Sequence, residues 1–301
     1  MTVDPLTEIV TLLQPSASFS KLVEYAGRWR ICRDVEAKPV YFAVLEGACR
    51  VICPEQPSII LRAGDFLLSP STNNQVIESI EAPPHGIKMQ PVEIGEGCFR
   101  VGRPGKPINL RMQVGLCSFA SPDAGLLVSL LPSMVVVREE PRLATLMQLV
   151  GDETRNARPG REVILERLLE VLLIEALRCG TDNVSVPSVA RGLSDDRLVA
   201  ALRAIHAKPA HGWTVADLAA EAAMSRSAFF ARFNRIVGMS PMEYLLTWRM
   251  ALAKRLLRDR ELTVEHVAAQ VGYGSASTFS TAFTRHVGTP PMRYARATFA
   301  G

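Results

Sequence analysis

The chain has 301 residues, of which 48% are hydrophobic and 21% charged, and its formal net charge at pH 7 is +4. This length is enough for two domains. The N-terminus reads MTVDPLTEIVTLL, without a signal-peptide pattern, and no apolar run is long enough to cross a membrane, so we expect a soluble, cytoplasmic protein with reduced cysteines.

The segment from Phe19 to Val137 has the pattern of short strands and turns. The runs VYFAVLEGACRVI, SIILRAGDFLLSP and INLRMQVGLCSF are rich in residues that favour strands and are separated by proline and glycine. Several short strands at regular spacing predict a barrel or a sandwich. Within this segment AGDFLLSP, from Ala63 to Pro70, resembles the turn, strand and proline of cupin barrels.

The metal-binding pattern of cupins is missing from this segment. That pattern needs two histidines and a carboxylate on one strand pair and a third histidine after the Gly-Asp turn, whereas this chain reads KPVYFAVLEG and SPSTNNQVI at those places. The only histidine in the N-terminal two thirds is His85. Because three imidazoles cannot converge, we expect no metal, no cofactor and no catalytic residue, and a barrel that binds a small ligand or none.

Two helices are predicted after the strands, from about Pro141 to Thr154 and from about Arg161 to Cys179. Their apolar faces can cover a sheet or form the seam of a homodimer, and the pattern fits both. The stretch that follows is polar and interrupted by proline, which indicates a linker over residues 181–195. It divides an expected sensor domain at 1–180 from a second domain at 196–301.

A helix-turn-helix pattern is written twice in the last third of the chain. The first copy, TVADLAAEAAMSRSAFFARFNRIVGMSPMEY, covers residues 214–244, and the second, TVEHVAAQVGYGSASTFSTAFTRHVGTPPMRY, covers 263–294. In each copy an apolar helical stripe is followed by a tight turn, a serine suited to cap a helix, and two phenylalanines four residues apart. The helix-turn-helix units are expected at about 214–235 and 263–286.

The two copies differ at the turn. The second has Gly272, which suits a left-handed conformation, whereas the first has Ala223, which costs about 1 kcal/mol if the same geometry is kept. Between the copies, the absence of a breaker after Pro241 predicts one helix to about Arg258. Such a helix is roughly 27 Å long, and a rigid spacer of that size can set two recognition helices about one DNA turn apart, near 34 Å.

These segments resemble the AraC/XylS family of bacterial transcription regulators. The resemblance covers roughly His206 to Tyr294 and rests on WTVADLA, MSRSAFFARF, YLLTWRM, VGYGSASTFSTAF and GTPPMRY. The N-terminal segment is similar to the cupin-like sensor domain of one branch of that family. The resemblance implies an α+β, two-domain protein: a cupin-like β-barrel with following helices, then an all-α domain of two helix-turn-helix units. It also implies promoter DNA and RNA polymerase as partners, a homodimer, a small-molecule effector, and activation of transcription.

The base-contact candidates face outward on the second helix of each unit, because that helix enters the major groove. The base-contact candidates are Arg226, Ser227, Phe230, Ala231, Ser277, Thr278, Ser280 and Thr281. Of these only Arg226 can make a bidentate contact to guanine, while Phe230 and Ala231 can meet thymine methyl groups. The phosphate-contact candidates are Arg232, Arg235, Arg249, Lys254, Arg285 and Arg293. From Asp195 onward, 14 Lys and Arg stand against 8 Asp and Glu, so this segment carries the basic excess.

Three other interpretations stay open at this point. A thiol-based sensor would use Cys49, Cys53 or Cys117, of which the first two form a C-x-x-x-C pair beside Arg50. An enzyme fused to a DNA-binding module is disfavoured, since the chain has neither the cupin histidines nor the reactive Pro-Cys-His-Arg motif of the DNA-alkylation repair protein in this superfamily. A regulator that needs no effector is the third, because an apolar barrel interior has the same sequence pattern whether it binds a ligand or is only packed with side chains.

Overall fold

The protein is described from a computed structural model, which covers residues 4–33, 39–53, 57–70, 74–84, 89–95, 97–103, 105–119, 127–128, 130–132, 134–156, 158–179, 187–258 and 262–298. Two compact units divide the chain. One contains residues 14–120 and 132–185, and the other contains residues 1–13, 121–131 and 186–301. Each unit is described by itself.

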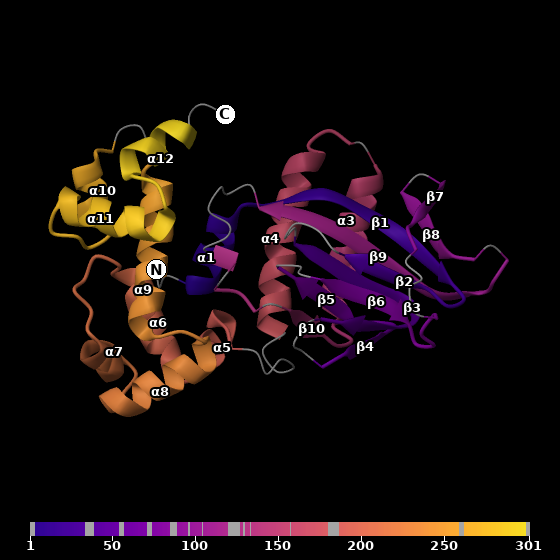
Figure 1. Cartoon of the computed structure of the whole chain (residues 1–301), viewed down its shortest axis with the longest axis horizontal. Helices are drawn as coiled ribbons and strands as arrows, with labels where there is room; N and C mark the ends of the chain where they lie inside the picture. The colour runs from indigo at the N-terminus through magenta and orange to yellow at the C-terminus, as the bar shows by residue number, and fades with distance from the viewer. Residues whose placement is uncertain are drawn as a thin grey trace. The chain divides into compact units, whose positions relative to one another are not determined.

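The first unit is a curled sheet with two helices (Figure 1). Its strands are β1 (Pro15–Ala26), β2 (Arg30–Arg33), β3 (Val40–Ile52), β4 (Ile59–Arg62), β5 (Phe66–Ser69), β6 (Gln75–Ser79), β7 (Val92–Gly95), β8 (Cys98–Gly102), β9 (Ile108–Phe119) and β10 (Val135–Val137). The strand order is β10-β5-β3-β9-β1-β8-β7, with β4 and β6 paired to β3 and β2 paired to β6. Apart from the parallel pair β1 and β8, neighbouring strands are antiparallel.

The long strand β3 curls the sheet because its two halves have different neighbours. Its first half pairs with β5 and β9, and its second half, from Ala48 on, pairs with β4 and β6. The change follows an irregularity in register between Val44 and Glu46 and a left-handed Gly47, with a φ of +82°. A Cβ at Gly47 would lie 2.0 Å from the Asn109 carbonyl oxygen, so only glycine fits this bend.

The apolar core of this unit lies inside the curl. Trp29, Phe42, Leu61, Leu110 and Met112 are among its fully buried side chains. The strand boundaries agree closely with the predicted elements, because the runs VYFAVLEGACRVI and INLRMQVGLCSF form β3 and β9. The expected barrel or sandwich is thus found as a curled sheet.

Two helices complete the sheet unit. They are α3 (Pro141–Arg155) and α4 (Arg161–Cys179), as predicted to within one residue. They pack on one another and against β1, which buries Leu143, Leu169 and Leu172. Part of their surface is nevertheless apolar and exposed, at Leu149, Val163, Ile164 and Val171.

The second unit is helical (Figure 1). Its helices are α1 (Pro5–Leu13), α5 (Val189–Ser194), α6 (Leu198–Ala207), α7 (Val215–Glu221), α8 (Arg226–Val237), α9 (Pro241–Leu256), α10 (Val264–Gln270), α11 (Ala276–Val287) and α12 (Pro291–Thr298). Helix α9 joins the two repeats without interruption, and its 16 residues span about 24 Å. No helix in the described part of the chain is long and apolar enough to cross a membrane.

The ends of this unit differ from the sequence-based division in two respects. Helix α1 belongs with the helical unit, although the sequence assigns residues 1–180 to one domain. Residues 181–186 of the predicted linker lie outside the described residues, but residues 189–194 form α5, which packs on α6 and α8. Ser188 caps α5 by accepting a hydrogen bond from the Arg191 amide.

Candidate nucleic-acid interface

The first helix-turn-helix consists of α7 and α8. Thr214 and Asp217 form a reciprocal capping box at the start of α7. The Ser225 hydroxyl accepts from the Ala228 amide and starts α8, which ends at a left-handed Gly238. Phe229 and Phe233 are fully buried under α8, so the residues between them face outward.

The second helix-turn-helix, α10 and α11, repeats this construction. Thr263 caps α10, Ser275 caps α11, and the left-handed Gly288 ends it. Phe279 and Phe283 are fully buried, as their counterparts are in the first unit. Both predicted serine caps are therefore confirmed.

The turns inside the two units begin with the same backbone geometry, although the second has one residue more, Gly274, before its capping serine. In the first, the Met224 amide donates to the Ala219 carbonyl, and in the second the Tyr273 amide donates to the Ala268 carbonyl, both at 2.9 Å. The residue before each donor is left-handed, with a φ of +50° at Ala223 and +82° at Gly272. The first unit thus keeps the left-handed position of the second without its glycine, at the conformational cost expected for alanine.

The predicted base-contact residues form an exposed surface on each second helix. Arg226, Ser227, Phe230 and Ala231 are exposed on α8; on α11 Ser277, Thr278 and Thr281 are exposed and Ser280 is half-buried. Two hydroxyls on α11 are already engaged, since Thr278 shares a hydrogen bond with the Ser275 hydroxyl and Thr281 donates to the Ser277 carbonyl. Arg226 is the one long polar side chain among these eight, and it occupies the first position of α8.

The predicted phosphate-contact residues divide into two groups. Arg235, Arg285 and Arg293 are exposed. Arg232 instead forms a bidentate ion pair with Asp195, with its Nη2 2.7 Å from a carboxylate oxygen. This pair holds the pKa of the half-buried Arg232 guanidinium above its ordinary value, through the hydrogen bond to Asp195 and the carboxylate charge.

The other two cations of that set are held inside the helical unit. Arg249 donates to the carbonyl oxygens of Pro209 and His211, at 2.8 Å each, and burial lowers the pKa of its guanidinium. Lys254 is buried, with its ammonium 5.5 Å from the centre of the Tyr294 ring. These contacts give Arg249 and Lys254 structural roles.

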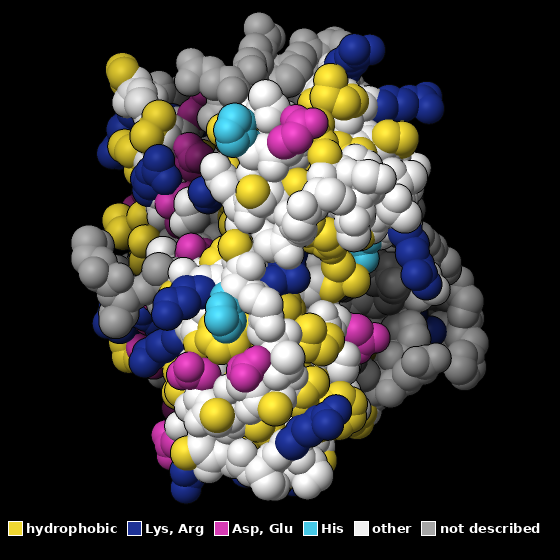
Figure 2. All heavy atoms as spheres, turned by 90° about the vertical axis from the view of Figure 1, so that its left-hand side faces the viewer, with side chains coloured by type: hydrophobic (Ala, Val, Ile, Leu, Met, Phe, Trp, Pro, Cys, Tyr) yellow, Lys and Arg dark blue, Asp and Glu magenta, His cyan; other side chains and the backbone are white. Residues whose placement is uncertain are grey.

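A groove of about 770 Å³ runs along α11. It is lined by Leu246 of α9 and by Ser277, Thr278, Thr281, Ala282, Arg285 and His286. Four of these seven are DNA-contact candidates. Figure 2 shows one face of the molecule, on which Lys and Arg side chains are scattered among hydrophobic, acidic and other side chains. An exposed recognition helix with hydroxyls and a cation beside a groove suits the edge of a DNA duplex.

The comparisons with known proteins agree with this geometry. A cupin family model matches residues 4–182 and a helix-turn-helix family model matches residues 218–297. An AraC-like transcription regulator of Streptomyces antibioticus is 33% identical over 97% of this chain and 98% of its own. The chain belongs to the AraC-like family of transcription regulators.

Other relatives resemble it over different lengths. The transcriptional regulator AlkR of Acinetobacter baylyi is 28% identical over 97% of this chain and 98% of its own. The DNA-binding domain of the transcriptional factor AdpA, solved in complex with a target DNA, is 32% identical and covers 35% of this chain and 96% of its own, with a TM-score of 0.34. This AraC-like regulator is thus a DNA-binding transcription regulator with a cupin domain, and not an enzyme.

The three cysteines predicted as redox candidates are buried or half-buried. Cys49 and Cys117 are fully buried, and burial raises the pKa of each thiol to about 12. Cys53 is half-buried beside the Gln75 amide, at 3.7 Å, and burial raises its pKa as well. Since the thiolate is the reactive form, raised pKa values disfavour a thiol-based sensor at Cys49, Cys53 or Cys117.

No group of three or more His, Cys, Asp and Glu within the described ranges could hold a metal ion. His85 lies outside the described residues. At the cupin-like turn, Asp65 is engaged otherwise: it accepts from the Arg62 amide at 2.8 Å and forms an ion pair with Arg138. These two contacts hold Asp65 in the turn between β4 and β5.

One buried polar cluster in the helical unit was not predicted. His206 of α6 contacts Glu8 of α1 through Nδ1 at 2.7 Å and the Tyr244 hydroxyl through Nε2 at 2.6 Å, and its ring stacks on Trp248 at 3.9 Å. A neutral imidazole satisfies both partners by donating from Nδ1 to the carboxylate and accepting from the hydroxyl. Burial lowers the pKa of His206, opposed by Glu8. No local pattern in the sequence pairs residues so far apart.

Proposed function

We propose that this AraC-like regulator acts in the cytoplasm as a homodimer that activates promoters with RNA polymerase. A small-molecule effector at the cupin domain controls it. The functional boundaries are those expected from the sequence: a sensor domain at 1–180, a linker at 181–195 and a DNA-binding domain at 196–301. The cupin and helix-turn-helix matches, at 4–182 and 218–297, support this division.

The observation that carries the proposal is the pair of matching, exposed second helices. On α8 the base contacts are assigned to Arg226, Ser227, Phe230 and Ala231, and on α11 to Ser277, Thr278, Ser280 and Thr281. Arg226 starts its helix and is exposed, so its guanidinium can reach a guanine edge. The short side chains on α11 can contact DNA but select only weakly among bases. Specificity therefore comes mainly from the first unit.

The phosphate contacts are assigned to the exposed Arg235, Arg285 and Arg293. Arg232, Arg249 and Lys254 leave the proposed set, because each is engaged by a neighbour inside the helical unit. If Arg232 left Asp195 to bind a phosphate, it would exchange one charge-assisted hydrogen bond for another, with little gain in free energy.

The homodimer is assigned to α3 and α4. Their exposed Leu149, Val163, Ile164 and Val171 are apolar side chains that a second subunit would remove from water. A signal bound at the cupin domain would act by favouring one arrangement of the two DNA-binding domains. This requires different affinities of the signal for the two arrangements.

The test compares Arg226→Ala with the wild-type protein on a bound promoter fragment and on variants of it with single base changes. Loss of the bidentate contact should weaken binding by about 1–3 kcal/mol and remove the preference for guanine at one position. Arg158→Ala, an exposed arginine of the sheet unit, is the matched control. Unchanged affinity and unchanged base preference in Arg226→Ala would refute the assignment.

A further inference from the structure

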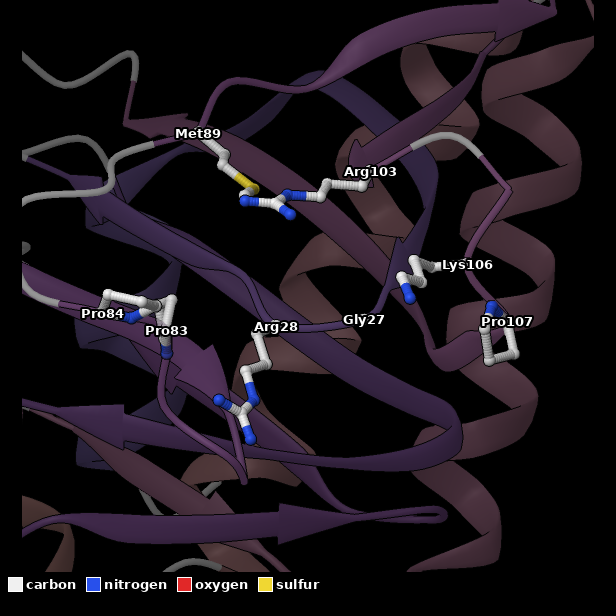
Figure 3. Close-up of a pocket in the computed structure, with 8 residues that line it drawn as sticks. All are labelled: Gly27, Arg28, Pro83, Pro84, Met89, Arg103, Lys106 and Pro107. Carbon is white, nitrogen blue, oxygen red and sulfur yellow. The ribbon is translucent and has the colours of Figure 1, made fainter.

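A pocket of about 460 Å³ lies in the sheet unit, where three connections between strands meet (Figure 3). Its lining comes from the β1–β2 turn (Gly27, Arg28), the segment after β6 (Pro83, Pro84, Met89) and the β8–β9 turn (Arg103, Lys106, Pro107). This volume is in the range of pockets that hold small organic ligands. It is separate from every residue assigned to DNA.

Backbone hydrogen bonds hold the three connections in place. The Gly27 amide donates to the Pro107 carbonyl at 3.4 Å, and its own carbonyl accepts from the Asn109 side-chain amide at 2.6 Å. The Met89 amide donates to the Arg30 carbonyl at 3.0 Å. Gly27 has a left-handed backbone conformation and lies against Lys106. The backbone therefore fixes the positions of these lining residues.

The lining combines two kinds of surface. Three prolines and Met89 form an apolar wall, while Arg28, Arg103 and Lys106 supply positive charge. Figure 3 shows Arg103 and Met89 extending toward one another from two of the connections. No acidic side chain is among the described residues that line the pocket.

The charge of the pocket is only partly compensated. Arg28 forms an ion pair with Glu81 at 3.1 Å, but both side chains are largely exposed, which makes the pair weak. For Arg103 and Lys106 no carboxylate partner occurs among the described residues. Arg28, Arg103 and Lys106 are all exposed to solvent, and a bound ligand that carries its own negative charge would replace the water that it removes from them.

We propose that this pocket binds an organic carboxylate with an apolar body. Arg103 and Lys106 hold the carboxylate, Arg28 adds to the field, and Met89 and the prolines pack on the body. A neutral ligand would leave cations partly desolvated without compensation, and an inorganic anion would leave the apolar wall uncovered. The inference rests on the proposed control by a small molecule and names the chemical class of that molecule.

Calorimetric titration of the full-length protein, without DNA, tests the site with defined probes. Octanoate and cinnamate are compared with 1-octanol, with octylammonium and with inorganic phosphate. At least one of the two carboxylates should bind roughly tenfold more tightly than the alcohol, since a charge-assisted contact is lost in the alcohol. Octylammonium and phosphate should bind weakly or not at all.

Two variants change the carboxylate affinity in opposite directions. The double variant Arg103→Ala/Lys106→Ala should weaken it roughly tenfold or more, to the level of the alcohol. Glu81→Gln should strengthen it slightly, because it removes a negative charge beside Arg28, and a folding defect cannot produce that gain. Arg158→Ala, outside the pocket, should leave it unchanged.

The proposal is overturned if neither carboxylate binds, if the alcohol binds as tightly, or if the double variant keeps the wild-type affinity. Because the titration contains no DNA, these outcomes are independent of the proposed DNA contacts. If the wild-type protein binds the carboxylate but recognises no promoter, the proposed function is contradicted and the proposed carboxylate site is still supported.

Discussion

At the level of single residues, Ala223 is the clearest strained position in the first helix-turn-helix, with a φ of +50°. Ala223→Gly should stabilise the protein by up to about 1 kcal/mol, after the larger entropy of glycine in the unfolded chain is subtracted. Gly272→Ala should do the reverse. There a Cβ would lie 2.7 Å from both the Ala210 carbonyl oxygen and the Arg249 guanidinium. Urea unfolding of both variants measures this, and a destabilised Ala223→Gly would show that the turn is not strained.

His206 makes stability depend on pH. Its pKa in the folded protein lies below the ordinary value of 6.5, because it is buried against Trp248 and Tyr244, and Glu8 opposes this only in part. The unfolded chain therefore takes up the proton first. The free energy of unfolding should fall as the pH drops below about 6.5, and the stability is fully present above that value.

The contribution of His206 is separated from other groups by the variant His206→Gln, which cannot titrate. The difference in stability between wild type and variant should be largest above pH 7 and should shrink toward pH 5. A constant difference over this range would mean that the imidazole does not change its charge on unfolding.

At the level of elements, the two sets of arginines on and near the recognition helices predict different salt dependence. Arg285→Ala should reduce the slope of log K against log salt by about 0.9, the loss of one phosphate contact. Arg232→Ala should leave this slope unchanged and lower stability, because it breaks the ion pair with Asp195. Fluorescence anisotropy at several salt concentrations gives the slopes. Equal slope changes in both variants would contradict the assignment of Arg285, and not Arg232, to a phosphate contact.

Local patterns predicted the elements well. The limits of β3, β9 and α4 follow from apolar periodicity, and Ser225 and Ser275 from cap chemistry, all of which act within a few residues. Contacts between residues far apart in the sequence could not be predicted from these patterns. An arginine looks the same in sequence whether it faces solvent or, like Arg232, pairs with a carboxylate 37 residues away.

The same limit applies to the packing of the N-terminal helix. Its residues read as the start of the sensor domain, yet α1 joins the helical unit, where Glu8 meets His206 across 198 residues of sequence. Nothing within α1 indicates this, since a short amphipathic helix fits either unit. The pocket of the sheet unit was likewise not predicted, because three separate connections build it.

At the level of the whole molecule, the account depends on two recognition helices joined by one uninterrupted helix. Helix α9 spans about 24 Å, and the second helices that it connects are expected in the major groove about one turn of DNA apart. Each subunit should therefore cover two short sequence elements about ten base pairs apart. A homodimer should cover two such pairs.

The most direct test is a footprint of the purified protein on a site recovered from its own genome, at two salt concentrations. The account predicts two protected elements about one helical turn apart per subunit, with binding that weakens steeply as salt rises. Arg226→Ala should alter the base preference of one element and leave the other. Binding without sequence preference at either salt concentration, or a single protected element per subunit, would contradict it.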